Sequence, residues 1–232
     1  MSLGSVGIVV AARSGSQRLP GKALLSLRGI PMLTFLLRRL RPARRAALYL
    51  ATTDLPADDA LEAAAIQEGV PVFRGADADV VARYVAAAER FSLDTVVRVT
   101  ADCPFVDAEL VDFCLEKVER IEAFDLATTK TKFPPGLDAE IYRADTMAKL
   151  HRDGRLDASE REHLTLHYYN HSDRYRIQYI DPMASWPSGA RHLTVDTAAD
   201  YAFATRLAAS LPAGDLSIGA VLRTAAGLMV TI

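Results

Sequence analysis

Short apolar runs rich in β-branched residues alternate along this chain with longer segments of helical period. The apolar runs occupy residues 6–12, 47–52, 72–73 and 95–100, and helical periods follow at 32–40, 56–69, 79–90 and 107–119. Such alternation is typical of βαβ units built around a mostly parallel sheet. The pattern therefore predicts an α/β fold with a mostly parallel sheet flanked by helices.

The pattern changes between residues 125 and 142, where the turn-rich stretch Lys130-Thr-Lys-Phe-Pro-Pro-Gly136 separates two strand-like runs. Insertions of this kind carry binding groups on top of a rigid scaffold. Beyond it we expect helices at 143–150, 159–171 and 197–209 and strands at 176–180 and 191–195. No repeat or linker divides the 232 residues, so we expect one domain, residues 1–232, with an inserted lobe at about residues 125–190.

The composition excludes several classes of protein. Half of the residues are hydrophobic and 24% are charged, which is typical of a folded globular domain rather than a disordered chain. The 27 basic and 29 acidic side chains leave a net charge of −2, so no overall field attracts nucleic acid or an acidic membrane. No apolar run approaches the ~20 residues that span a bilayer, and no secretion signal opens the chain, so we expect a cytoplasmic location.

Cys103 and Cys114 form no Cys-x-x-Cys pair, and we expect free thiols in or near the core.

A loop suited to polyphosphate follows the first predicted strand directly. Its sequence is Ala12-Arg-Ser-Gly-Ser-Gln-Arg-Leu-Pro-Gly-Lys22, with two glycines, two hydroxyls and three cations. Such a loop offers close backbone approach, N–H donors and fixed positive charge. It is not a Walker A loop, because five residues separate Gly15 from Gly21 and Ala23 follows Lys22. The alternative is a Ser/Gly-rich turn with solvated cations.

Two aspartates occupy similar places far apart in the sequence. Asp102 follows the predicted strand 95–100, and Asp196 follows the predicted strand 191–195. Because ligands of open α/β sheets bind at the carboxyl ends of the strands, both carboxylates should face the 12–22 loop. Such a pair suits Mg²⁺, which takes one or two protein oxygens and fills its other positions with water and phosphate. Taken singly, each aspartate is a candidate helix cap.

Seven short stretches, spread over nearly the whole chain, carry a resemblance to a known family. They are Arg13-Ser-Gly-Ser-Gln-Arg-Leu-Pro-Gly-Lys22, Ala51-Thr-Thr-Asp54, Val72-Phe-Arg-Gly75, Arg98-Val-Thr-Ala-Asp-Cys-Pro104, Gly136-Leu-Asp-Ala-Glu140, Ser159-Glu-Arg-Glu-His163 and Leu193-Thr-Val-Asp-Thr197. Together they resemble the spore-coat-polysaccharide type of the cytidylyltransferase family, which also includes acylneuraminate and 3-deoxy-manno-octulosonate cytidylyltransferases. The resemblance implies a Rossmann-like nucleotide-diphospho-sugar transferase fold and a homodimer. It also implies synthesis of a CMP-sugar and pyrophosphate from CTP and a sugar or sugar acid, with Mg²⁺.

The same resemblance implies roles for individual residues. Arg13, Lys22, Asp102 and Asp196 would be catalytic, and the two aspartates would hold the metal. The residues implied at the nucleotide are Ala12, Arg13, Ser14, Gly15, Arg18, Lys22, Arg74 and Thr100. Asp138, Glu140 and His163 match positions that face the sugar. The chain departs from the family pattern at Ala11, where Gln or Pro is usual, and at Ala101, where Gly is usual.

Other functions remain as alternatives. The nearest is a nucleotidyltransferase of the same fold that uses UTP or GTP, followed by a non-catalytic nucleotide-sugar-binding protein and a nucleic-acid binder that uses the basic run 38–45. His163, His167 and His171 fall on one face of the predicted helix 159–171, but no acidic or thiol ligand of matching register accompanies them. We therefore expect this helix to pack through Tyr168 and Tyr169 rather than bind a metal.

Overall fold

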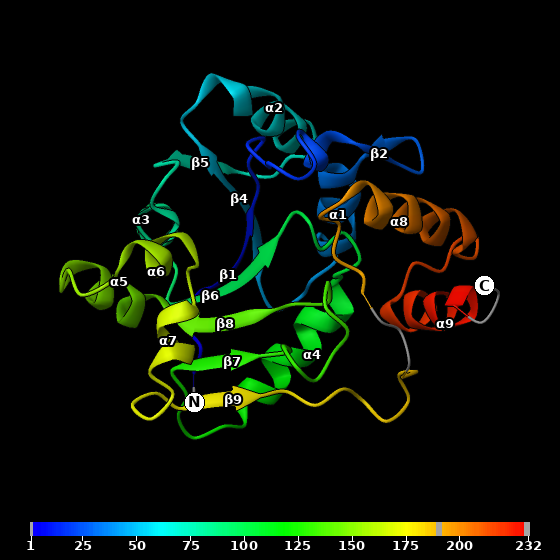
Figure 1. Ribbon diagram of the computed structural model, residues 1–232. Coiled ribbons are helices and arrows are strands. Elements are labelled where there is room, and N and C mark those ends of the chain that lie inside the picture. The colour runs from blue at the N-terminus through cyan, green and yellow to red at the C-terminus, as the bar shows by residue number, and fades with distance from the viewer. Residues whose placement is uncertain (1, 189–191, 230–232) are drawn as a thin grey trace.

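Seven strands form the central sheet, in the order β5-β4-β1-β6-β8-β7-β9 (Figure 1). This computed structural model describes residues 2–188 and 192–229. The parallel strands are β1 (Val6–Ala11), β4 (Ala47–Thr53), β5 (Val72–Gly75) and β6 (Thr95–Thr100). β8 (Glu140–Arg143) runs antiparallel to β6 and to β7 (Leu126–Thr128), and β9 (Ile177–Tyr179) is parallel to β7. The predicted mostly parallel α/β sheet is confirmed.

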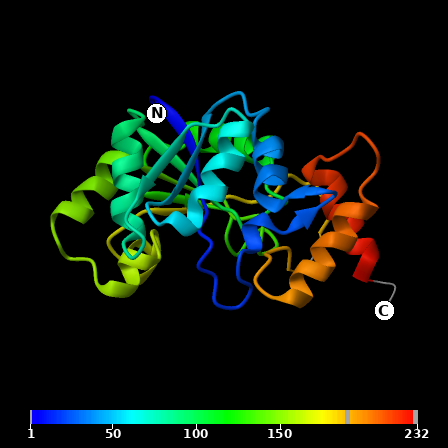
Figure 2. The same ribbon diagram turned by 90° about the horizontal axis from the view of Figure 1, so that it is seen from above.

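Helices cover both faces of the sheet. One face packs against α1 (Met32–Leu40), α2 (Asp59–Gln67), α4 (Ala108–Glu119), α8 (Ala198–Ser210) and α9 (Ile218–Met229). The other packs against α3 (Val80–Arg90), α5 (Ala144–Arg152) and α7 (Leu166–Asn170), with α6 (Ala158–Glu162) leading into α7. Figure 2 shows α5 and α8 at opposite ends of the molecule. Buried strands with helices on both faces need apolar residues on both sides, and Ile8, Val9 and Val10 are accordingly all buried.

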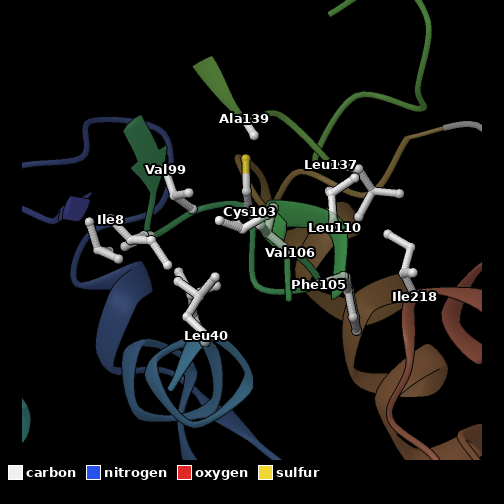
Figure 3. Packing of buried hydrophobic residues seen from close by; sticks show 14 of the residues in the cluster. Ile8, Leu40, Val99, Cys103, Phe105, Val106, Leu110, Leu137, Ala139 and Ile218 are labelled. Atoms are coloured by element: carbon white, nitrogen blue, oxygen red, sulfur yellow. The ribbon is translucent and has the colours of Figure 1, made fainter. Parts of the chain in front are cut away.

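The larger core lies between β1, β6 and the helices α1 and α4. Ile8, Val99 and Leu40 belong to it, and Figure 3 shows Cys103 in the same cluster. Cys103 and Cys114 are both free and buried, as the sequence predicts. Burial raises the pKa of the Cys103 thiol well above its ordinary value, so this side chain acts as a small packing residue at the end of β6.

The segment 125–190 lengthens the sheet. It supplies β7, β8 and β9 and the helices α5 to α7. The predicted helix 159–171 is wrong, because His163 leaves the helical conformation (φ −109°, ψ 81°) and ends α6. The bend turns Leu164 into the core and lets the Thr165 hydroxyl donate to the buried Glu140 at 2.8 Å. Tertiary contacts therefore override the helical period of this segment.

The predicted strand 191–195 is also wrong for residues 192–195, whereas residue 191 lies outside the described part of the chain. The backbone N–H groups of this segment donate to loops rather than to a strand: Leu193 N–H donates to Pro135 O at 2.7 Å, and Val195 N–H donates to Asp102 O at 2.8 Å. Residues 193–194 pass directly over Gly136 (φ 98°), and we call this contact the crossing. It requires glycine, because a Cβ at residue 136 would overlap the backbone of Leu193 and Thr194. The crossing delivers Asp196 to the edge where β1 and β6 end.

The basic run 38–45 is held by carboxylates. Arg38 and Arg41 pair with Glu68 at 2.9 and 3.4 Å. Arg39 of the same run is buried beside Asp107 at 3.4 Å, so its charge is not available to a nucleic acid. Among the described residues, no helix has both the length and the apolar character needed to cross a membrane.

Candidate active site

The 12–22 loop begins at the end of β1, between the ends of β4 and β6, and Asp58 anchors its start. The Ser14 N–H donates to Asp58 Oδ1 at 2.7 Å, and the Ser14 hydroxyl donates to Ala57 O at 2.9 Å. Asp58 is buried and also accepts from the Thr53 hydroxyl at 2.5 Å. Burial alone would raise the pKa of Asp58, but the hydrogen bonds from Thr53, Ser14 and Thr52 lower it on balance.

Lys22 joins the two predicted metal ligands at the other end of this loop. Its Nζ lies 2.9 Å from Asp102 Oδ2 and 2.9 Å from Asp196 Oδ1, and it also donates to Val195 O at 3.0 Å. The structure therefore brings together the two carboxylates and the lysine that the sequence placed 80 and 174 positions apart. One cation already lies between both carboxylates.

The charges of this trio support one another. Burial alone would lower the pKa of Lys22, but the Coulombic fields of Asp102 and Asp196 and their hydrogen bonds raise it above its ordinary value. Burial likewise opposes ionisation of Asp102, but Lys22 and the Thr100 hydroxyl, 2.5 Å from Asp102 Oδ1, lower its pKa on balance. Asp102 is therefore ionised at neutral pH and ready to share a cation.

A cleft of about 870 Å³ opens above these groups. Its lining includes most of the predicted residues, namely Ala12, Arg13, Gly15, Arg18, Lys22, Thr100, Asp102, His163 and Asp196, together with Ala11 and Ala101. Arg18 is exposed and pairs with Asp196 at 3.1 Å. Arg13 crosses the cleft to pair with Glu162 of α6 at 3.1 Å. A second cavity of about 740 Å³, between α1 and residues 214–217, contains none of the predicted residues.

Two further arginines line the cleft, Arg83 of α3 and Arg98 of β6, and the sequence analysis assigned a role to neither. Arg83 is buried and donates to Ala76 O at 2.6 Å, and Arg98 forms an ion pair with Glu140. Arg83 falls in the apolar stripe of its helix, beside Val80 and Tyr84. A charged residue in such a stripe is the signal that could have revealed it.

Four predicted residues lie outside the lining of the cleft. Ser14 faces Asp58, and the Arg74 guanidinium contacts Asp59 and Glu62 at 2.7 Å each. Asp138 accepts from Gly136 N–H at 3.0 Å, and burial raises its pKa. Glu140 is completely buried.

Glu140 is the centre of a charged network beneath the cleft. It pairs with Arg98 and, at 3.0 Å, with Lys130, and it accepts from the Tyr169 hydroxyl at 2.8 Å. Burial opposes its ionisation, but Arg98 and Lys130 lower its pKa to about 2. The Glu140 carboxylate is thus fully occupied by contacts within the protein, and it fixes the position of Arg98.

Comparison with known proteins identifies the family. A sequence model described as cytidylyltransferase matches residues 7–213. The chain belongs to the cytidylyltransferase family. This cytidylyltransferase is 34% identical over 201 residues to the spore coat polysaccharide biosynthesis protein SpsF of Bacillus subtilis, covering 83% of this chain and 82% of the relative. It is also 41% identical over 128 residues to the 3-deoxy-manno-octulosonate cytidylyltransferase of Methylococcus capsulatus, covering 52% of this chain and 48% of that protein.

A solved structure agrees with this assignment. A cytidylyltransferase from Leptospira borgpetersenii superposes on this cytidylyltransferase with a TM-score of 0.89, at 28% identity, and covers 97% of this chain and 95% of the other. The predicted fold and the predicted class of enzyme, a nucleotidyltransferase, are therefore confirmed.

Proposed function

We propose that this enzyme forms a CMP-sugar or CMP-sugar acid and pyrophosphate from CTP and a sugar, with Mg²⁺ held by Asp102 and Asp196. The observation that carries the proposal is the position of Lys22 Nζ, 2.9 Å from a carboxylate oxygen of each aspartate, at the end of the 12–22 loop. Carboxylate oxygens that already share one cation are the donor set that a hard dication prefers. The names of the two curated relatives support a sugar or sugar acid as the acceptor.

The chemistry of such a transfer is in-line attack by a sugar oxygen on the α-phosphorus of CTP, with pyrophosphate as the leaving group. Catalysis of this kind depends on positioning and on neutralising charge, and needs no nucleophilic side chain. When bound, Mg²⁺ would neutralise phosphate oxygens. Arg13, Arg18 and Lys22, which all line the cleft, would bind the triphosphate and stabilise the charge that gathers on pyrophosphate.

Lys22 has two positions in this scheme. In the free enzyme its ammonium neutralises both aspartates. In the complex with nucleotide, the Lys22 ammonium would pair with phosphate oxygens in place of the carboxylates. Asp102 and Asp196 would then hold the metal, so the loop that binds the nucleotide would also control access to the metal ligands.

The sugar would lie on the side of the cleft formed by α6 and β6. His163 lines the cleft there and is our candidate for the base that accepts the proton of the attacking hydroxyl, because imidazole exchanges protons near neutral pH. Arg98 lies in the same lining and offers a cation to an acidic sugar. Asp138 remains a proposed sugar contact, and Glu140 would act by holding Arg98.

We also propose a homodimer. β9 lies at the edge of the seven-stranded sheet and exposes Tyr179. Edge strands with unpaired backbone groups are ready sites for pairing with another chain. Light scattering of the purified protein measures the mass directly, and a monomer at micromolar concentration contradicts this part of the proposal.

The decisive experiment measures pyrophosphate release with CTP, UTP, GTP or ATP. Each nucleotide is supplied with 3-deoxy-manno-octulosonate or an acylneuraminate, with and without Mg²⁺. We expect release with CTP and Mg²⁺ and its loss in Asp102→Asn and Asp196→Asn, whereas the exposed Asp54→Asn serves as the matched control. Preference for another nucleotide would overturn the assignment of the base. Thermal stabilisation by nucleotide without any turnover would favour a binding role.

A further inference from the structure

Three side chains converge beside the wall of the cleft, outside the site described above. They are Glu160 of α6, His167 of α7 and His171, which directly follows α7. His167 Nδ1 lies 3.1 Å from Glu160 Oε2, and His171 Nε2 lies 3.7 Å from Glu160 Oε1. Each residue offers one ligand atom, and the three atoms lie within 4.8 Å of one another. The bend at His163 creates this cluster, because it folds α7 back beside α6 (Figure 1).

Two of the three side chains are largely buried. The side chain of Glu160 is 5% exposed and that of His167 is 12% exposed. Asn170 Nδ2 donates to Glu160 Oε1 at 3.1 Å, and the Tyr175 hydroxyl lies 3.2 Å from His167 Nε2. These contacts orient the carboxylate and the ring from behind, as outer-shell partners orient metal ligands.

The contact between His167 Nδ1 and Glu160 lacks the alignment of a hydrogen bond. His167 Nδ1 is buried and has no hydrogen bond of good geometry within the described residues, although Glu160 Oε2 is only 3.1 Å away. If His167 Nε2–H donates to Tyr175, the lone pair of Nδ1 faces an ionised carboxylate. Two electron-rich groups that face each other out of water favour a positive charge between them, which either a proton on Nδ1 or a metal ion supplies.

We propose that Glu160, His167 and His171 bind a transition-metal dication of the zinc class. With metal–ligand bonds of about 2.0–2.1 Å, neighbouring ligands of a tetrahedral ion lie roughly 3.3 Å apart. His167 Nδ1 lies 3.1 Å from Glu160 Oε2 and His171 Nε2 lies 3.7 Å from Glu160 Oε1, and one ligand atom from each residue lies within 4.8 Å of the other two. Two imidazoles and one carboxylate leave the fourth position to water.

The chemistry of its ligands distinguishes this site from the aspartate pair. Imidazole nitrogen suits zinc and its neighbours in the transition series, whereas oxygen-only ligands suit magnesium. The site at Asp102 and Asp196 therefore selects a hard ion, and the site at Glu160 selects a softer one.

A metal here would stiffen one wall of the cleft. α6 has only five residues, too few to be stable without tertiary contacts. Its last residue, Glu162, pairs with Arg13, and the next residue, His163, lines the cleft. A dication on Glu160 would fasten α6 to α7 and so fix the side of the cleft that faces Arg13.

The test is a Co²⁺ titration of the intact, chelator-treated protein, followed by visible absorption, with excess Mg²⁺ present to occupy the aspartate pair. We expect one Co²⁺ per chain, with the intense bands of a tetrahedral ion, and displacement by Zn²⁺. Loss of a single outer-shell partner already weakens metal binding by about 10–100-fold, so His171→Ala should weaken it by at least about 100-fold. The exposed His192→Ala is the matched control and should bind as the wild type does.

His171 is chosen because it is the most exposed of the three side chains, at 36%. A melting curve of each variant without metal establishes that it is folded. Equal Co²⁺ binding by His171→Ala and the wild type would overturn the proposal. Failure of the wild type to bind Co²⁺ or Zn²⁺ at micromolar concentration would also overturn it, and neither result would affect the proposed transfer reaction.

Discussion

Ser14 and Asp58 fasten the 12–22 loop to the neighbouring strand. The Ser14 N–H donates to Asp58 Oδ1 at 2.7 Å, and the same carboxylate, through Oδ2, accepts from the Thr53 hydroxyl of β4 at 2.5 Å. One buried carboxylate therefore ties the first turn of the loop to the sheet. These contacts of Ser14 position its neighbours Arg13 and Gly15 in the cleft, and the nucleotide contact that the resemblance implies for Ser14 stays a prediction.

Asp58→Asn should weaken this anchor. The amide cannot accept from both Ser14 and Thr53 as a carboxylate does, and leaving a buried donor without a partner costs about 1–3 kcal/mol. We expect a comparable loss of unfolding free energy in urea and weaker binding of CTP, measured by calorimetry. Asp54→Asn, on the exposed side of the same turn, is the control. Unchanged CTP affinity in Asp58→Asn would show that the loop keeps its shape without this anchor.

Lys22→Met should have two opposite effects. Pyrophosphate release should fall about 100- to 1,000-fold, because the cation that we propose to stabilise the leaving group is lost. Without nucleotide, however, the variant should bind Mn²⁺ more tightly than the wild type, because no ammonium competes for Asp102 and Asp196. Water-proton relaxation measures the Mn²⁺ affinity, and Lys149→Met on the exposed side of α5 is the control. Weaker Mn²⁺ binding in Lys22→Met would contradict the proposed exchange of cations.

Gly136→Ala should damage both stability and activity. The added Cβ meets the backbone of Leu193 and Thr194, and the residue already has a positive φ of 98°. Backbone strain of this kind and the overlap should together cost about 3 kcal/mol or more. Gly154→Ala has a similar positive φ of 65° but open space around the new Cβ, so it should lose only about 1 kcal/mol. Equal losses of unfolding free energy in the two variants, measured in denaturant melts, would show that the contact between Gly136 and residues 193–194 contributes nothing to stability.

Glu140→Gln should reduce stability, and any rise in the KM for an acidic sugar should accompany that loss because Glu140 holds Arg98. Removing one partner of a buried ion pair leaves Arg98 uncompensated and costs about 3–5 kcal/mol. A raised KM for the sugar at unchanged stability would instead indicate direct contact with the substrate. The exposed Glu89→Gln is the control for the charge change.

The ion pair between Glu140 and Arg98 predicts that stability depends on pH. The pKa of Glu140, about 2 in the folded chain, is below the ordinary glutamate value of about 4.3. Its contribution to stability is therefore complete above the unfolded pKa and is lost as the pH falls through the folded pKa. The difference in unfolding free energy between wild type and Glu140→Gln should accordingly shrink between about pH 4 and pH 2. A difference that stays constant over that range would exclude this contribution.

The sequence predicted the part of the site that follows from parallel strands. Because the carboxyl ends of β1 and β6 meet at one edge, Lys22 and Asp102 had to come close together once their strands were identified. Asp196 reached the predicted place for a different reason, since residues 192–195 form no strand and are held by loops. The predicted position of Asp196 at the sheet edge was right, although the strand predicted before it was wrong.

What the sequence could not show depends on bends and on burial. A helical period through residues 159–171 gives no sign of the turn at His163, so the closeness of Glu160 to His167 was invisible. Glu140 likewise looks like a binding residue in a short motif. Its burial depends on Arg98 and Lys130, which reach it from another strand and a separate loop.

The contact of Gly136 with the backbone of Leu193 also sets an order of assembly. A growing chain contains the 12–22 loop and Asp102 long before residue 192 is synthesised, and until then Lys22 has one carboxylate to pair with. The second arrives only when the late segment passes over Gly136. If Asp196 holds the metal as proposed, a chain that ends before residue 192 lacks one metal ligand and should be inactive.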